Sequence, residues 1–402
     1  MHLNQDNLFL VSKIDNQPQF YFIEYLKSKS LDSKAIVISN NNLEETPHKY
    51  YFKATFYNNN TIIQKKEIQF SNIFINDLTS QLLNFIHSTY YFYKIVKKNN
   101  LYNCNIFSEN LKLTLICFIL KKINLIKKIS FFNGDILPNN IYSSYFQKGY
   151  KPIRIFKNLL FIKSTFIIKY ICLKFSQEII YSSDKVRTWD STHFNINIDS
   201  KFYLIPNPNN FKLSKKFSLI RKKSLNIIYF GNLNINNGID QIINLSVMLK
   251  NNANKFCITI VGGSSQLIEI YSNKIFKLGL TKHFIFKGRV DNLFDIETTE
   301  NQSFGIAPYF FNDINNESYV DNGKINDYLN LCLPIITTKY AFRSKDITNY
   351  NLGFVSNDIN NIFSYLININ SKLYDELIEN VLKYNYDNDY KVFLDDHHQI
   401  LH

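Results

Sequence analysis

The stretch that decides the fold is residues 319–338, which read YVDNGKINDYLNLCLPIITT. A polar loop ends at Gly323, a helix pattern begins at Lys324, and Pro334 then opens the apolar run Ile335-Ile336. Apolar runs rich in β-branched residues and bounded by turn signals are typical of buried strands. The order of loop, helix start and strand predicts a repeating unit of an α/β protein.

The same stretch has the chemistry of an anion site. Free N–H groups and the positive end of a helix dipole at 323–325 attract an anion, and Lys324 adds a positive charge. Asp327, one turn later, can accept hydrogen bonds from two neighbouring hydroxyls, as on a ribose or another sugar. The alternative is structural, because the helix dipole alone favours an Asp in the first turn and surface lysines are common.

Strand and helix patterns alternate outward from this stretch. The C-terminal half has strand patterns at 226–230, 256–261, 284–286, 304–307, 334–337 and 353–355. Helix patterns lie between them, at 239–250, after the N-cap residue Ser264 and after the N-cap residue Asp358. This alternation predicts a doubly wound parallel sheet, with ligands bound at the carboxyl ends of its strands. Gly231 and Gly262 are expected at that edge.

The N-terminal half repeats the rhythm in its later part. We predict strands at 105–107, 128–132, 178–181 and 201–205 and helices at 111–123 and 153–175, whereas 41–66 reads as extended or irregular. The turn Pro206-Asn207-Pro208 marks a boundary. The expected division is an N-terminal domain at 1–207, a linker at 208–224, a second domain at 225–370, and a closing helical segment at 371–402. In that segment Leu373, Leu377, Val381 and Leu382 share one helical face.

The central stretch resembles the donor-site motif of the GT-B glycosyltransferases. That motif has a Lys, an acidic-Tyr-Leu triplet and a small-Leu-Pro-Val/Ile-Ile turn, which correspond here to Lys324, Asp327-Tyr328-Leu329 and Cys332-Leu333-Pro334-Ile335-Ile336. Family members usually carry Glu at the position of Asp327 and Gly at that of Cys332. The landmarks YFGNL, IVGG, FKGRV and GIAPY precede it in the family's order.

The resemblance implies the GT-B architecture, in which two Rossmann-like domains face a central cleft and a last helix crosses back to the first domain. It places Gly231, Asn232 and Asn237 in the loop that receives the donor diphosphate. Many relatives carry Arg and Lys at the two Asn positions. With both charges absent, diphosphate binding is left to backbone amides, Lys324 and Arg289.

Other implied residues come from a subgroup that reads Tyr-x-Asp-x-Gly-Lys. Asp321 and Gly323 match that pattern and, with Asp327 and Tyr328, complete the expected donor site, while retention or inversion at the anomeric carbon stays open. In the N-terminal domain Asp135 matches an acceptor-site Asp that binds or deprotonates the acceptor hydroxyl. Its alternative is a turn-forming Asp beside Gly134.

Charge is distributed unevenly along the chain. Of a net charge of +13, residues 1–210 hold +12, with 26 Lys and Arg against 14 Asp and Glu. Only Arg154 and Arg187 are arginines there, and base or phosphate reading in nucleic acid prefers Arg. This favours an anionic membrane surface as partner and no nucleic acid, although the cations of 153–175 fall around the whole helix circumference.

Cysteine spacing and hydropathy bound the setting. The five cysteines are scattered without CxxC spacing, which indicates reduced buried thiols and predicts no metal site. The sequence shows no secretory leader pattern and no apolar run of membrane-spanning length, so a cytoplasmic location, peripheral to the inner face of the membrane, is expected.

The expected function is transfer of a sugar from a UDP- or GDP-linked donor to a hydroxyl of a glycan or polyprenyl-linked acceptor. The resemblance implies cell-surface polysaccharide biosynthesis as the setting, and no cofactor or metal is expected. Lys324 and Asp135 are the catalytic candidates. Two alternatives are open: a sugar-phosphate epimerase on the same fold, and a degenerate GT-B protein that acts as a non-catalytic binding or scaffolding subunit.

Overall fold

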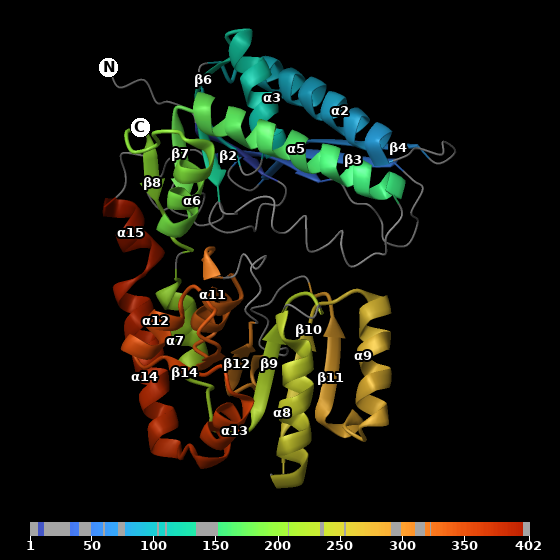
Figure 1. The fold of residues 1–402 in the computed structure, drawn as a ribbon. Helices are drawn as coiled ribbons and strands as arrows, with labels where there is room; N and C mark the ends of the chain where they lie inside the picture. Colours follow the sequence, from blue (N-terminus) through green and yellow to red (C-terminus); the bar gives the residue numbers. More distant parts are fainter. Residues whose placement is uncertain are drawn as a thin grey trace. The chain divides into compact units, whose positions relative to one another are not determined.

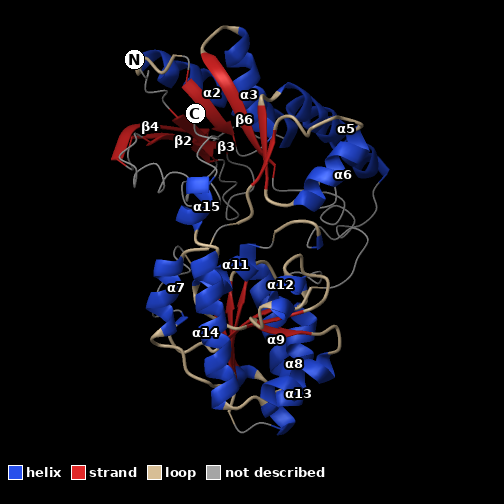
Figure 2. Ribbon diagram, turned by 90° about the vertical axis from the view of Figure 1, so that its left-hand side faces the viewer, coloured by secondary structure: helices blue, strands red, loops and turns tan. Residues whose placement is uncertain are grey.

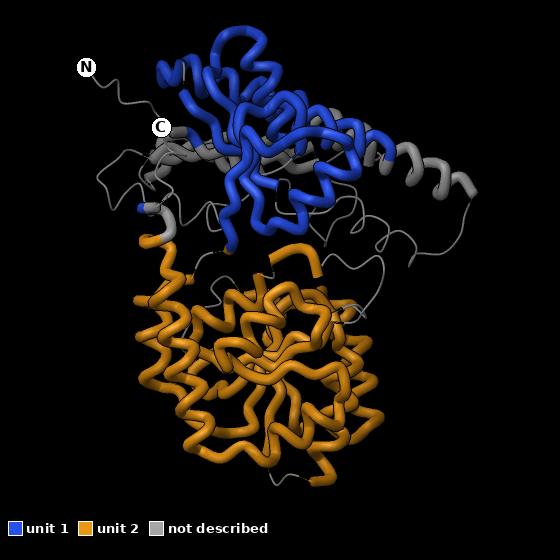
Figure 3. The backbone as a smooth tube through the Cα atoms, turned by 60° about the vertical axis from the view of Figure 1, so that its left-hand side comes forward, with its two compact units in different colours: residues 1–206, 394–402 blue, residues 207–393 orange. Residues whose placement is uncertain are grey.

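The computed structural model divides the chain into two compact units. Unit 1 contains residues 1–206 and 394–402, and unit 2 contains residues 207–393 (Figure 3). The residues that the structure describes are 7–11, 33–39, 50–58, 61–70, 77–102, 104–108, 111–133, 152–207, 209–233, 237–252, 255–290, 299–309, 318–321 and 323–396.

Unit 1 is built on an eight-stranded sheet with the order β4-β3-β2-β1-β5-β6-β7-β8. Its strands are β1 (Asn7–Val11), β2 (Ser33–Ser39), β3 (Tyr50–Asn58), β4 (Thr61–Phe70), β5 (Cys104–Ser108), β6 (Ile126–Asn133), β7 (Glu178–Tyr181) and β8 (Phe202–Leu204). All neighbours are parallel except β2 with β3 and β3 with β4, which pair antiparallel. Residues 41–66 were expected to be extended or irregular, and the described ones are extended, because the alternating segments 50–58 and 61–70 form a hairpin at the sheet edge.

In the described part of unit 1, four helices follow strands: α2 (Asp77–Lys98), α3 (Leu111–Lys122), α5 (Pro152–Phe175) and α6 (Asp184–Phe194). Helix α3 contacts α2, α5, β5 and β6, so it lies between the other two long helices (Figures 1 and 2). Its buried side chains, such as Ile116 and Leu120, pack with Phe92 and Ile95 of α2 and with Ile106 and Ile129 of the sheet. The observed helices at 111–122 and 152–175 confirm the two helix patterns predicted there.

Unit 2 is a parallel six-stranded sheet with the order β11-β10-β9-β12-β13-β14. Its strands are β9 (Asn226–Phe230), β10 (Cys257–Val261), β11 (Phe284–Gly288), β12 (Phe304–Ala307), β13 (Ile335–Thr337) and β14 (Gly353–Val355). The order reverses between β9 and β12, which makes the carboxyl ends of these two strands the topological switch point of a doubly wound sheet. Each predicted strand of this half is present.

The helices of unit 2 are α7 (Phe211–Ser218), α8 (Ile239–Asn252), α9 (Ser265–Lys277), α11 (Gly323–Asn330), α12 (Ser344–Asn349), α13 (Ile359–Asn368) and α14 (Ser371–Asp387), with a 3-10 turn at Thr281–His283. Helix α15 (Tyr390–Asp396) spans the boundary between the units. The predicted caps are confirmed: the Ser264 side chain accepts from the N–H of Leu267, and Asp358 accepts from Asn360.

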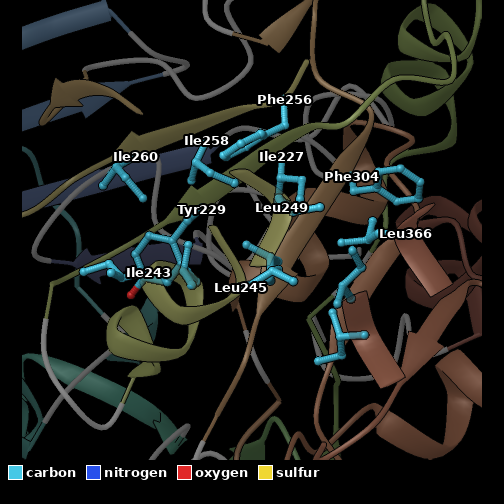
Figure 4. Packing of buried hydrophobic residues seen from close by; sticks show 14 of the residues in the cluster. Ile227, Tyr229, Ile243, Leu245, Leu249, Phe256, Ile258, Ile260, Phe304 and Leu366 are labelled. Atoms are coloured by element: carbon cyan, nitrogen blue, oxygen red, sulfur yellow. The ribbon is translucent and has the colours of Figure 1, made fainter. Parts of the chain in front are cut away.

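The core of unit 2 lies between its sheet and helices α8, α13 and α14. Ile227, Tyr229, Ile258 and Ile260 project from β9 and β10, and Phe304 adds an aromatic ring from β12 (Figure 4). These side chains are buried because both faces of a parallel sheet are covered. Burial of apolar surface stabilises a fold by roughly 25 cal/mol per Å², and a second cluster of unit 2, which includes Tyr328 and Ile335, contributes in the same way.

Two expectations about the boundaries differ from the structure. The segment expected as a linker, 208–224, contains α7, whose N-cap Asn210 accepts from the N–H of Leu213 and which packs against α11 and α14 within unit 2. Helix α14 likewise belongs to unit 2, and only the terminal residues 394–402 are grouped with unit 1. On α14, Leu373 is exposed and its neighbour Tyr374 is buried instead, with its hydroxyl donating to the Ser303 carbonyl at 2.9 Å.

Candidate functional site

The candidate site begins with glycines at the carboxyl edge of the unit 2 sheet. Gly231 follows β9, Gly262 follows β10, and Gly288 ends β11. The Gly231 N–H donates to the Val261 carbonyl at 2.9 Å, and the Gly262 N–H donates to the Gly288 carbonyl at 2.6 Å. The backbone segments at the ends of β9, β10 and β11 are therefore in direct contact, and a side chain between them would push them apart.

Gly262 is required by this close approach. Its φ is +115°, a conformation that L residues rarely adopt, and a Cβ there would lie 2.4 Å from the Gly231 carbonyl oxygen. Such an approach leaves the sheet edge lined by peptide groups and without bulky side chains. A strand end without a Cβ lets a phosphate approach the backbone closely.

Lys324 reaches the same edge from α11. A Cβ on Gly231 would lie 3.2 Å from Lys324 Cε and 3.5 Å from its Nζ, so the lysine side chain lies across the glycine. The ammonium group stands 4.8 Å from the Tyr229 ring centroid and 4.9 Å from that of Tyr309. Cation–π attraction holds a cation over aromatic faces. The sequence-predicted pair Gly231 and Lys324 is therefore brought together, with the start of α11 beside it (Figure 1).

The loop after Gly231 is held by neutral groups. The Tyr229 hydroxyl donates to the Asn232 carbonyl at 2.7 Å, and the Asn237 side-chain amide donates to the same oxygen at 3.1 Å. Asn232 itself is exposed and Asn237 is half-buried. The two Asn positions thus lie on one loop as expected, and Asn237 contributes to its conformation.

Tyr328 lies in the core of unit 2. Its hydroxyl accepts from the Phe230 N–H at 3.0 Å and donates to the Ile306 carbonyl at 2.9 Å, so it bridges the ends of β9 and β12 at the switch point. The ring also fills the space beside Gly305, where a Cβ would lie 2.3 Å from Tyr328 Cγ. These contacts fix the strand ends, and the donor-binding role expected for Tyr328 stays a prediction.

Asp321 is part of a buried ion pair. Its carboxylate accepts from Arg343 Nε and, at 2.6 Å, from Arg343 Nη2, and the Asn207 N–H donates to it at 2.6 Å. Arg343 also donates to the Asn207 carbonyl at 2.7 Å. Two protein partners thus occupy both carboxylate oxygens. The observed contacts anchor the loop before α11 to the start of unit 2, and direct donor binding by Asp321 stays a prediction.

Asp327 is a half-buried carboxyl of α11, four residues after Gly323 and therefore just beyond the first turn, where the sequence pattern had placed it. Burial raises its pKa from 3.8 to about 7, because desolvation disfavours the charged form. A carboxyl with such a pKa changes its charge near neutral pH. Hydrogen bonds donated by ligand hydroxyls would favour the ionised form, as expected for a residue that receives a ribose.

The remaining predicted residues are placed as follows. Gly323 is exposed at the start of α11, and a Cβ on it would meet nothing within 4 Å. Arg289 is exposed and follows β11 at the same sheet edge. Asp135 lies outside the described residues, and its acceptor role stays a prediction.

The described part of the chain lacks two other kinds of feature. No group of three or more His, Cys, Asp or Glu side chains there is arranged to hold a metal ion. Within the same residues, no helix combines the length and apolar character that crossing a bilayer requires. All five cysteines are free, and four of them are buried, as the spacing predicted.

Three contributors to the site were not predicted as site residues. Gly262 was expected at the edge only, Tyr309 lies in the GIAPY landmark, and Arg343 has no sequence signal because it lies 22 positions from Asp321. The positive φ of Cys332, 51°, explains why the resembled motif usually has Gly there. A strand followed by Gly-Gly, as at 262–263, is the signal that could have identified Gly262.

Comparison with known proteins places this geometry in a family context. Residues 247–396 match the family model of the glucosyltransferase 3-like C-terminal domain. No curated protein matches the sequence. Sucrose-phosphate synthase from Thermosynechococcus elongatus is similar in structure, with a TM-score of 0.67, 10% identity and coverage of 99% of this chain and 98% of that one.

Two other solved structures are similar over the full length. HepE from Anabaena, in complex with UDP and glucose, has a TM-score of 0.63 and 13% identity and covers 99% of both chains. A glycosyltransferase from Rickettsia africae has a TM-score of 0.59 and 14% identity, with 99% of this chain and 98% of that one covered. At these identities the structural likeness shows the fold, which is GT-B. The chain thus has the GT-B fold, and its residues 247–396 match the glucosyltransferase 3-like C-terminal domain.

Proposed function

We propose that the protein transfers a sugar from a nucleoside diphosphate sugar, UDP- or GDP-linked, to a hydroxyl of a glycan or polyprenyl-linked acceptor. The observation that carries the proposal is the approach of Lys324 to Gly231 at the switch point of the unit 2 sheet. It combines an ammonium group, a helix start and closely spaced peptide groups at one edge. Similar structures in complex with UDP and with UDP-glucose support the nucleotide class.

In the proposed reaction the acceptor oxygen forms a bond to the anomeric carbon as the bond from that carbon to the diphosphate breaks. The nucleoside diphosphate departs with the bonding electron pair, and the acceptor proton passes to a base. Lys324 and the amides beside it stabilise the negative charge that develops on the departing diphosphate. Asp327 accepts hydrogen bonds from donor hydroxyls, and Asp135 is the proposed base.

The proposed setting is assembly of a cell-surface polysaccharide at the inner face of the membrane, with the protein in the cytoplasm. One of the similar structures is WaaG, described as a glycosyltransferase involved in lipopolysaccharide biosynthesis. That description applies to WaaG, and it supports a lipid-linked acceptor for this chain only as a hypothesis. Acceptor assays with polyprenyl-linked and free glycans would separate the two acceptor classes.

Titration of UDP and GDP by calorimetry tests the proposal. Wild-type protein should bind one of them saturably, and Lys324→Ala should weaken binding roughly 10- to 100-fold, since a charge-assisted contact contributes about 1.5–3 kcal/mol. Lys345→Ala on α12 is the matched control, because this lysine is exposed and belongs to another helix of the same unit. Equal binding by wild type and Lys324→Ala would refute the role of Lys324.

The second candidate is a non-catalytic subunit that binds a nucleotide or glycan without transfer. It is favoured by Asn232 and Asn237, which are neutral where many relatives of the resembled family carry Arg and Lys. Asn237→Lys separates the candidates. If the loop is an impaired diphosphate site, the new cation should tighten UDP binding several-fold, whereas a loop that never meets a diphosphate should leave affinity unchanged.

A further inference from the structure

The helices of unit 1 carry an exposed face that the proposed chemistry does not use. Helices α2, α3 and α5 pack in one layer with α3 in the middle (Figures 1 and 2). Each presents exposed isoleucine or tyrosine beside exposed lysine. We call this set the basic helical face, and its members are Ile86, Tyr90, Lys94, Lys97, Ile119, Lys122, Ile123, Lys163, Ile167, Tyr170 and Lys174.

The spacing shows that these residues form continuous stripes. On α5, Lys163, Ile167, Tyr170 and Lys174 are separated by four, three and four positions, which places them on one side of a helix. The stripe on α2 repeats the pattern with Ile86, Tyr90, Lys94 and Lys97, and the end of α3 adds a shorter one. Large apolar side chains are well exposed on each stripe: Ile86 50%, Tyr90 62%, Ile119 42%, Ile123 52% and Ile167 60%.

The charge of this layer is almost entirely positive. The sequences of the three helices contain three, three and five Lys or Arg, against the single acidic residue Asp77. Lys169, which seemed to place a cation on the opposite side of α5, is fully buried in an ion pair with Asp190 at 2.7 Å. Lys169 therefore belongs to the interior of unit 1. The other cations of α5 whose side chains the structure describes, Lys163 and Lys174, are both exposed on the stripe of that helix.

We propose that the basic helical face docks on an anionic phospholipid bilayer. Isoleucine and tyrosine side chains would enter the boundary between headgroups and acyl chains, and lysine ammonium groups would lie level with the lipid phosphates. A surface of this composition fits lipid better than nucleic acid, because its cations are lysines and its apolar members are mainly aliphatic. Aliphatic side chains cannot stack on bases, and arginine is the preferred reader of base edges.

Unit 2 offers a matched contrast. Helix α9 also exposes apolar side chains, Ile270 at 53% and Phe276 at 72%, but Glu269 and the ion pair of Lys274 with Asp240 lie among them. Exposed apolar area by itself therefore does not single out the basic helical face. The distinguishing feature is the combination of apolar stripes with cations on helices whose single acidic residue is Asp77.

Vesicle flotation tests the electrostatic part with the full-length protein. Wild type should bind vesicles of phosphatidylglycerol and phosphatidylcholine and should bind pure phosphatidylcholine far less. The triple variant Lys97→Gln/Lys122→Gln/Lys174→Gln should lose roughly 100-fold in affinity, at about fivefold for each lysine near the surface. Raising the salt concentration should weaken wild type more than the variant.

A second variant tests the apolar part. Ile119→Ser/Ile167→Ser should lower vesicle affinity at least 10-fold without changing the salt dependence, since it removes buried apolar area and no charge. Ile270→Ser/Phe276→Ser on α9 is the control and should bind as wild type does. All of these side chains are exposed, so unchanged melting and circular dichroism would show that each variant is folded.

Three results would overturn the proposal. Wild-type protein could fail to bind anionic vesicles, or the control and face variants could lose the same affinity for them. The third is tighter binding of wild-type protein to duplex DNA than to anionic vesicles. It stands independently of the proposed transferase activity. The face variants should bind UDP as wild type does, and Lys324→Ala should bind vesicles as wild type does. Failure of one inference would thus leave the other measurable.

Discussion

The carboxyl edges of the two sheets differ in how their polar groups are satisfied. At the unit 1 edge, Asn133 ends β6 beside its register partner Tyr181 on β7, and Asn133 donates to the Asp190 carboxylate. Asp190 pairs with Lys169 at 2.7 Å, and both side chains are fully buried. The unit 1 edge is therefore closed, where described, by its own opposite charges.

The unit 2 edge is built the other way. Gly231, Gly262 and Gly288 replace side chains with peptide groups, and Lys324 lies across Gly231 with its ammonium group beside the rings of Tyr229 and Tyr309. A parallel sheet binds ligands where its strand ends are left accessible to them. The difference shows that the strand ends of a parallel sheet can have a structural role or a ligand-binding role, depending on which groups occupy them. Variants that change one edge and spare the other can test this.

The largest expected effect is at the closed edge. Lys169→Met should destabilise unit 1 by about 3–5 kcal/mol, because it leaves Asp190 buried without its partner. Urea unfolding followed by the fluorescence of Trp189, the single tryptophan of the chain, reports on this unit, since the Lys169 ammonium lies 5.5 Å from its ring centroid. Lys163 is exposed on the same helix, so Lys163→Met should change the free energy of unfolding by less than about 0.5 kcal/mol.

UDP binding by Lys169→Met tests whether the unit 1 edge has any part in nucleotide binding. Under conditions where Lys169→Met is folded, its affinity for UDP should equal that of wild type. If Lys169→Met lowered the free energy of unfolding by less than about 1 kcal/mol, the closed-edge interpretation would be wrong. It would also be wrong if the double variant Lys169→Met/Asp190→Leu were no more stable than Lys169→Met.

The next effect compares two glycines of unit 2. Gly262→Ala should cost about 2 kcal/mol, because its φ of +115° is strained for Ala and the new Cβ would meet the Gly231 carbonyl. Gly323→Ala, which meets nothing within 4 Å, should leave stability unchanged or raise it by about 0.5–1 kcal/mol. Thermal unfolding followed by circular dichroism measures both.

Nucleotide binding makes the glycine pair more informative. If a phosphate approaches the start of α11, Gly323→Ala should weaken UDP binding although the fold is no less stable. A stable Gly323→Ala protein with wild-type affinity would remove Gly323 from the donor site and leave the anion to Lys324 and the strand ends.

Asp327 should give a smaller, pH-dependent effect. Its pKa of about 7 in the folded protein exceeds the unfolded value of 3.8, so the folded state holds the proton more tightly and stability falls as pH rises from about 4 to about 7. Because solvent partly screens this half-buried side chain, Asp327→Asn should remove roughly 2 kcal/mol of this fall between pH 4 and 8, about half of what the two pKa values alone would give. Urea midpoints at both pH values measure it, and parallel profiles for the two proteins would contradict it.

The proton should also report on the ligand. If Asp327 receives donor hydroxyls as a carboxylate, nucleotide-sugar binding at pH 6 should release protons, because the ligand favours the ionised form. Calorimetry in two buffers of different ionisation enthalpy measures that release. Asp327→Asn should abolish it, and an unchanged release would assign the proton to another group.

The sequence predicted the elements of unit 2 well because each carries its own local signal. β9 is a short β-branched run, α9 and α13 have cap residues, and Lys324 follows Gly323 at a helix start. Strand ends in a parallel sheet share one edge by topology, so the meeting of Gly231 with the α11 region was also predictable. Local pattern and topology were sufficient there.

What the sequence did not predict depends on contacts between distant positions. The 50–70 hairpin has alternation but a charged, Lys-rich sequence, and α7 lies in a polar segment that is stabilised by packing against α11 and α14. The partners of Asp321 lie at 207 and 343, and their choice depends on how three loops converge. A carboxylate in a motif therefore cannot be assigned to ligand or protein without its surroundings.

The smallest expected effect concerns Tyr328, the residue that ties the switch point together. Tyr328→Phe keeps the ring beside Gly305 but removes the hydroxyl that bridges the Phe230 N–H and the Ile306 carbonyl, and should cost about 1 kcal/mol. Urea unfolding of unit 2 measures this loss. If Tyr328 serves only to fix the strand ends, UDP affinity should change by no more than about twofold. If a folded Tyr328→Phe protein instead lost 10-fold or more in UDP affinity, the hydroxyl would belong to the donor site. The unit 2 edge would then bind its ligand partly through a side chain of the sheet core.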